Sequence, residues 1–281
     1  MTKSAKLLPF CLCFGVALGA QDSKPTSRPA APQDPAALLR TLEENGVHVD
    51  PKAHTVTIEC EMGRPVDALE YVLIHRKGKT HEALVVTDVV PSLLNAGLLA
   101  IGLERGNNAR VEEIEPAPTL EEVQAGAEWM RVYPAEGKSM WMTLTWEDDG
   151  EKHVDVPVEA LLLDLTTGET LRDNRWVFLG GNMAPLLRGE DPVFMADYQG
   201  NIVSSCYMYP NNHLVTVVHE RANSDDNWWL VQDLCPPPGT KMKMTFHRDK
   251  PDSVVARESA LAKDAERKAA EPAQDEPPQD R

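Results

Sequence analysis

The densest run of apolar residues in the chain, apart from the N-terminus, lies between positions 69 and 106. Leu69–His75 and Thr80–Thr87 are rich in Val, Ile and Leu, and a polar stretch with one glycine, residues 76–79, separates them. Two such runs joined by a short polar connector predict a β-hairpin.

A short apolar helix is predicted directly after this hairpin. Pro91 suits a first helical turn because its missing N–H has no partner there in any case. Leu94, Leu98 and Ile101 repeat at helical spacing, and Gly102 offers a place to stop. The hairpin and this helix form the predicted centre of the fold.

Most of the remaining pattern predicts strands. Residues 139–146 alternate between apolar and polar positions, a turn signal follows at 147–150, and 153–163 returns as a partner strand. A second hairpin is predicted for 193–207, turning at Gln199 and Gly200, and a last strand for 240–247.

The predicted fold is therefore mainly β, of the α+β type. It comprises about ten strands in an antiparallel sandwich or curved sheet, one central apolar helix, and a short N-terminal helix capped by Asp34. A capping-box pattern at Thr119 and Glu122 predicts one further short helix.

Composition divides the chain into four parts. Lys3 and Lys6 precede the apolar segment 7–20, which predicts a signal peptide over residues 1–20 and export to the periplasm or the cell exterior. Residues 21–35 form a Pro-rich spacer. One domain is expected over 36–248, and the acidic tail, 249–281, is expected to be a frayed helix or disordered.

Charge narrows the range of partners. The formal net charge is −16, and loss of the two lysines with the signal peptide would make it −18. Such a surface repels phosphate backbones and anionic lipids, so we expect no nucleic-acid partner. We also expect no membrane span in the mature chain.

Three cysteines follow the signal peptide: Cys60, Cys206 and Cys235. In an oxidising compartment a Cys206–Cys235 disulfide is the preferred pairing, which allows a thiol/disulfide redox role. Three thiolates cannot supply the four ligands of a usual iron–sulfur cluster, so no such cluster is expected.

His75, His81 and Glu82 are the candidate metal ligands, because the predicted hairpin would bring the two histidines near one another. The structural alternative is that His81 and Glu82 close a polar network at the turn with Lys79 or Arg76. No zinc-protease motif supports the metal site, since Val85 occupies the position that would need a second histidine.

Trp228, Trp229 and Tyr207 are the candidate ligand-binding residues. Adjacent tryptophans on a strand point to opposite faces, so one of them is expected to be exposed. An exposed tryptophan favours an apolar or sugar-like ligand, or a protein partner. The alternative is that these aromatic residues belong to the core.

Several stretches resemble the YdjY-type domain, a family of exported bacterial proteins of uncharacterised function. The resemblance rests on GVHVDPKAHTVTIECE, the segment LEYVLIHRKGKTHEALVVTDVVPSLLNAGLLAIGL, and the later RWVFLGG, VFMADYQGNIVS and PPPGTKMKMTF. It implies an exported, mainly β domain and brings no catalytic or ligand-binding residue with it.

The first functional hypothesis is thus an exported, non-enzymatic module that binds a ligand or an envelope protein. The second is a metal-dependent or metal-carrying protein that uses His75, His81 and Glu82. The third is a thiol/disulfide redox protein. The chain contains no G-x-S-x-G elbow, no phosphate-binding glycine loop and no dinucleotide fingerprint.

Overall fold

The computed structural model describes residues 34–172, 175–210 and 212–270. The predicted signal peptide, nearly all of the spacer and the last part of the acidic tail lie outside these residues. Within them, no helix has the length and hydropathy needed to cross a membrane.

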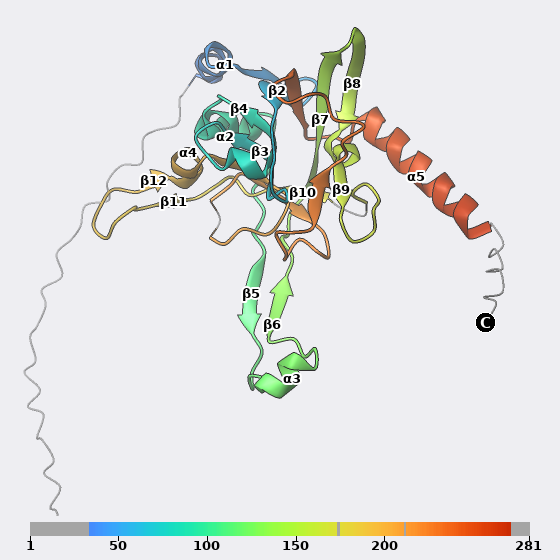
Figure 1. Cartoon of the computed structure of the whole chain (residues 1–281). Helices are drawn as coiled ribbons and strands as arrows, with labels where there is room; N and C mark the ends of the chain where they lie inside the picture. The colour runs from blue at the N-terminus through green and yellow to red at the C-terminus, as the bar shows by residue number, and fades with distance from the viewer. Residues whose placement is uncertain (1–33, 173–174, 211, 271–281) are drawn as a thin grey trace, which may run out of the picture.

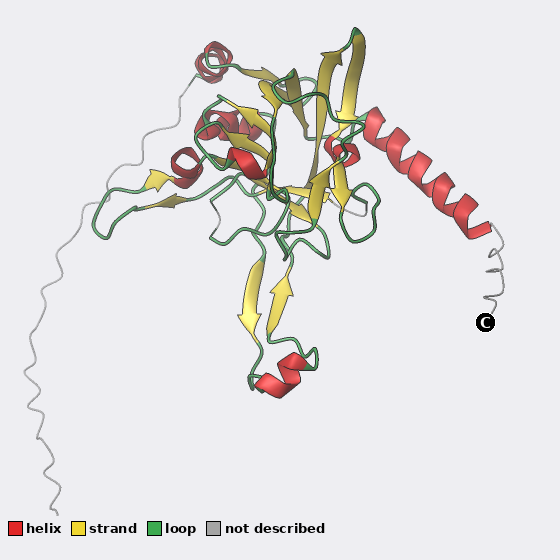
Figure 2. Ribbon diagram, in the orientation of Figure 1, coloured by secondary structure: helices red, strands yellow, loops and turns green. Residues whose placement is uncertain are grey.

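Ten strands of the described chain form one sheet, and eight of them close into a barrel (Figures 1 and 2). The order around the barrel is β2-β16-β7-β10-β14-β13-β3-β4, and the end of β2 pairs with β4 to close it. The remaining two strands extend the barrel, β1 alongside the start of β2 and β8 alongside β7. The strands of this sheet are β1 (Val47–Asp50), β2 (Thr55–Met62), β3 (Tyr71–His75), β4 (Ala83–Thr87), β7 (Ser139–Asp148), β8 (Glu151–Pro157), β10 (Arg175–Phe178), β13 (Asn201–Ser204), β14 (Val215–Val218) and β16 (Lys241–His247).

Shorter elements decorate this barrel. Three strand pairs stand apart from it: β5 (Arg110–Glu113) with β6 (Met130–Tyr133), β9 (Leu162–Asp164) with β15 (Trp228–Leu230), and β11 (Met183–Ala184) with β12 (Val193–Phe194). The helices are α1 (Pro35–Glu44), α2 (Pro91–Ala100), α3 (Leu120–Gln124), α4 (Met195–Gln199), α5 (Asp252–Ala270) and the short 3-10 helices η1 (Thr80–Glu82) and η2 (Val158–Leu161).

The mainly β class is confirmed, but the sheet is a closed barrel rather than a sandwich or an open curved sheet. It is also not wholly antiparallel, because β3 pairs with β4 and β13 with β14 in parallel. Closure depends on two residue pairs between β2 and β4, Glu61 with Val86 and Met62 with Val85. A closed sheet leaves no free edge in its circuit, which local sequence patterns do not reveal.

The predicted hairpin at 69–87 is wrong. After His75 the chain turns, passes through η1 and starts β4 beside the beginning of β3, so that Tyr71 pairs with Ala83 and His75 with Thr87. Every residue of both strands is buried. Parallel strands buried on both faces form continuous apolar runs of this kind, whereas half-exposed hairpin strands alternate.

The predicted hairpin at 193–207 is also wrong. Residues 195–199 form α4, and Gly200 ends this helix with a φ of 81°, a conformation that favours glycine. β13 then pairs with β3 and β14 instead of turning back on itself. Helix α4 also serves α2, since the Asp197 Oδ1 accepts a hydrogen bond of 2.7 Å from the Ser92 backbone N.

The individual strands and helix caps were predicted more reliably than the pairing of the strands. The strands predicted at 139–146 and 240–247 are present as β7 and β16, and they pair with each other in the barrel. Asp34 caps α1, and Thr119 and Glu122 form the capping box of α3. Helix α2 begins at Pro91 and packs against β1, β2, α1 and α4.

Two segments project from the barrel (Figure 1). Residues 107–136, called the arm below, leave through the bridge between Asn107 and Glu136 and carry β5 and β6 with α3 at the tip. The first turns of helix α5 attach it to the barrel: Val254 is buried, and the Arg257 guanidinium donates a hydrogen bond of 2.9 Å to the Leu171 carbonyl. From residue 252 to residue 270 the tail is one continuous helix.

Candidate functional site

The predicted metal ligands do not meet. His75 ends β3, where its Nδ1 accepts a hydrogen bond of 3.1 Å from the Lys77 backbone N. His81 lies in η1 beside the start of β3, and its carbonyl accepts a hydrogen bond from Val66. The parallel register therefore places the two histidines at opposite ends of the strand pair. Among the described residues, no group of three or more His, Cys, Asp or Glu side chains is placed to hold a metal ion.

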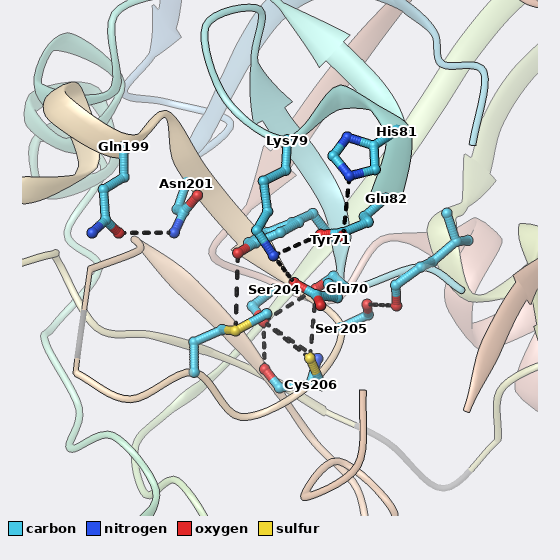
Figure 3. Close-up of polar contacts among 12 residues, drawn as sticks. Glu70, Tyr71, Lys79, His81, Glu82, Gln199, Asn201, Ser204, Ser205 and Cys206 are labelled. Atoms are coloured by element: carbon cyan, nitrogen blue, oxygen red, sulfur yellow. Dashed lines mark hydrogen bonds and ion pairs between the residues drawn. The ribbon is translucent and has the colours of Figure 1, made fainter. Parts of the chain in front are cut away.

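Glu82 belongs instead to a polar network with Lys79, the structural alternative considered from the sequence (Figure 3). The Lys79 Nζ lies 2.8 Å from one Glu82 oxygen and 2.9 Å from one Glu70 oxygen. The His81 Nε2 lies 3.3 Å from the other Glu82 oxygen. Arg76 takes no part, because it pairs with Glu61 and Asp88.

The pKa values of the two carboxyl groups in this network are shifted in opposite directions. Burial raises the pKa of Glu70, with the nearby Glu82 adding to the effect. Burial acts to raise the pKa of Glu82 as well, but hydrogen bonds from Lys79 and Glu70 hold it below its usual value. One lysine thus joins two mostly buried carboxyl groups, and the network fastens η1 to β3.

The three described cysteines are free thiols, so the predicted Cys206–Cys235 disulfide is not formed. The Cys206 Sγ lies 3.8 Å from the carbonyl of Glu70, the residue before β3, while Cys235 lies in the turn after β15. Burial raises the pKa of each thiol, including Cys60, to about 12. At neutral pH these groups carry almost no thiolate, the form that attacks disulfides.

The predicted aromatic residues have three different roles. Tyr207 is almost fully buried and its hydroxyl donates a hydrogen bond of 3.4 Å to the His219 carbonyl. Trp228 is a fully buried core residue whose ring meets the His219 ring edge-on, with 5.1 Å between centroids. Trp229 is half-buried on β15, opposite Leu163 of β9.

Tyr207 also lines a cleft of about 700 Å³, where the arm joins the barrel. This volume lies in the range that holds small organic ligands, roughly 300 to 1,000 Å³. One wall is the start of β6 and the residues before it, and the other is the end of β14 and the loop that follows. The lining residues are Glu128, Trp129, Met130, Arg131, Val132, Pro134, Tyr207, Val218, His219, Glu220 and Asn223.

The cleft combines aromatic, apolar and charged groups. Trp129 is 53% exposed at its rim, and Met130 and Val132 give one wall an apolar face. Glu128, Glu220 and Arg131 supply charges of both signs. On the barrel side of the cleft, burial raises the pKa of the Tyr207 hydroxyl, which keeps this group neutral.

The sequence pattern predicts Tyr207 as a ligand-binding residue but does not predict the cleft wall formed by the arm. Trp129 lies in a polar stretch rich in glutamate and proline. The pattern of this stretch predicts one short helix and no strand. A lone tryptophan in such surroundings is a signal that an aromatic residue is exposed. His219 was also missed, because nothing local links it to Tyr207 or to the arm.

A family profile for the YdjY domain matches residues 47–247. The match covers the whole barrel, from β1 to β16, and includes the arm and the cleft. No similar curated protein and no similar solved structure was found. The chain therefore belongs to the YdjY domain family.

Proposed function

We propose that this chain is an exported, non-enzymatic binding module that holds a ligand in the cleft between the arm and the barrel. The cleft itself supports this proposal, because it is large enough for a small organic molecule and is lined by Trp129, Tyr207 and charged groups. Aromatic rings offer contact area at little entropic cost, and charged neighbours orient what they hold.

The remaining chemistry of the chain fits binding better than catalysis. Cys206 is buried and Cys235 is half-buried, and the raised pKa of each keeps both thiols protonated at neutral pH, which argues against the redox role proposed for them. Glu82 is engaged with Lys79, and His75 lies away from His81, which argues against the metal-dependent alternative. Export is proposed from the signal-peptide pattern of residues 1–20.

A fragment screen tests the binding proposal. Small aromatic, anionic and cationic compounds would be screened against residues 21–281 by ligand-observed NMR. We expect binders whose affinity falls at least tenfold in Trp129→Ala, since truncating an aromatic anchor typically removes more than about 1.4 kcal/mol. Leu187→Ala, at an exposed position between β11 and β12, is the matched control and should leave binding unchanged.

Two results would overturn the proposal. One is that every binder binds Trp129→Ala as tightly as the parent protein, which would place binding elsewhere. The other is near-stoichiometric metal in protein purified without chelator or affinity metal, lost on His81→Ala, which would favour the metal-dependent alternative.

A further inference from the structure

The arm extends well beyond the cleft that its base helps to form (Figure 1). β5 and β6 pair only with each other among the described strands, from Arg110 opposite Tyr133 to Glu113 opposite Met130. All four residues of β5 are exposed. An isolated two-stranded ribbon is marginally stable in water, so this ribbon is a poor structural support.

The side chains on one face of the ribbon contact each other, whereas the other face has an exposed apolar side chain. On one face the Arg110 guanidinium lies 3.7 Å above the centroid of the Tyr133 ring and also pairs with Glu112. The other face carries Val111 opposite Val132, with the exposed Glu113 opposite Met130 beside them. Val132 packs against the core, but Val111 is 38% exposed. The second face is an apolar surface left partly uncovered.

The tip of the arm carries another exposed apolar residue. Leu120 opens α3 and is 72% exposed, although the capping box of Thr119 and Glu122 fixes the helix start. A capped helix therefore holds this leucine in a solvent-exposed position. Exposed apolar residues on an ordered, projecting element are typical of a protein-binding surface.

The charge of the arm indicates what covers it. Residues 110–133 contain six glutamates and two arginines, a formal charge of −4. Both arginines are engaged inside the arm, Arg110 with Glu112 and Arg131 with Tyr133. The charged side chains of residues 110–133 that make no hydrogen bond or ion pair in the described structure are all glutamates, and each is exposed: Glu113, Glu115, Glu121 and Glu128. A second copy of this chain would bring like charge against like charge.

We infer that the arm is a docking element for a partner polypeptide that is basic and carries apolar side chains, and that Val111 and Leu120 are its apolar anchors. The apolar surface supplies the affinity, and the glutamates select a cationic partner and speed its approach. This goes beyond ligand binding in the cleft, because it assigns a second class of partner to β5 and α3, which do not line the cleft.

Three nine-residue peptides serve as probes, alternating lysine with valine, glutamate with valine, or lysine with serine. Binding to residues 21–281 would be measured by calorimetry at low and at physiological salt. We expect the Lys/Val peptide to bind, more weakly at higher salt, and the other two to bind at least tenfold more weakly. The Val111→Ser/Leu120→Ser double variant should lose at least tenfold in affinity for the Lys/Val peptide.

Controls separate this surface from the cleft and from general charge attraction. Leu187→Ser, another exposed leucine, should bind the Lys/Val peptide like the parent protein. The double variant should still bind cleft fragments, whose loss in Trp129→Ala reports on the proposed function alone. Equal binding of the Lys/Ser peptide, no binding of the Lys/Val peptide, or a dimer that the double variant abolishes would each overturn the inference.

Discussion

The barrel and the arm both contain antiparallel strand pairs, yet they differ in what surrounds each strand. In the barrel, β16 lies between β2 and β7 and pairs with both along its length. In the arm, β5 has one partner and no covering layer. Strand β16 is therefore held by a strand on each side and by the core on its inner face, whereas β5 is held mainly by β6. The difference indicates that stability is concentrated in the barrel and that the arm is free to serve recognition.

The largest expected difference in stability between the barrel and the arm comes from the same substitution at two leucines. Leu84 is fully buried in β4, and Leu120 is 72% exposed at the arm tip. Leu84→Ala should lower the free energy of unfolding by about 2 to 5 kcal/mol, because it leaves a cavity. Leu120→Ala should change it by less than about 0.5 kcal/mol. Urea unfolding followed by tryptophan fluorescence measures both, and equal losses would contradict the contrast.

A pH dependence of the barrel follows from His213. This side chain is fully buried, neither ring nitrogen has a hydrogen-bond partner in the described structure, and burial lowers its pKa from 6.5 to about 4. Above pH 7 the ring is neutral in both states. Between pH 6.5 and about 4 only the unfolded chain takes up the proton, so stability falls as pH is lowered, by up to about 1.4 kcal/mol per pH unit.

His213→Leu should therefore flatten the pH dependence. The parent protein should lose about 2 kcal/mol more than the variant between pH 7.5 and 5, measured by urea unfolding at each pH. The arm contains no histidine, so removing it should leave this difference in place. Parallel stability curves for parent and variant would show that His213 is not the group responsible.

Ion pairs should show the same contrast on a smaller scale. Lys79→Met leaves Glu70 and Glu82 mostly buried without their shared cation, and should lower the free energy of unfolding by about 1 to 2 kcal/mol. Arg110→Met removes an exposed pair with Glu112 in the arm and should cost less than about 0.5 kcal/mol. Thermal unfolding of the two variants under one buffer condition compares them directly, and a larger loss for Arg110→Met would reverse the expected order.

Local signals in the sequence predicted the elements better than their partners. The alternation of 139–146 and the caps at Asp34 and Thr119 depend on neighbouring residues, and all of these are present in the structure. The pairing of β3 with β4 depends on the 3-10 turn and on the Lys79 network, which no periodicity encodes. Barrel closure depends on two residue pairs between strands more than twenty residues apart.

The candidate site was harder to predict for the same reason. Tyr207 is recognisable as an aromatic residue with a polar end, but its cleft forms only when the arm and the end of β14 come together. Trp129 and His219 lie on either side of four barrel strands in the sequence, and they line the two walls of that cleft. The metal hypothesis failed to gain support because a parallel register replaced the predicted hairpin and separated His75 from His81.

Removal of the arm tests most directly whether stability and recognition are divided in this way. Residues 110–133 would be replaced by Asn-Gly, a two-residue loop that joins Ala109 to Pro134, just beyond the bridge between Asn107 and Glu136. We expect a folded protein whose free energy of unfolding is lower by only about 1 kcal/mol, the contribution of the half-buried Val132. An unfolded protein, or a loss above about 3 kcal/mol, would show that the arm is part of the barrel's stability and not a separate recognition element.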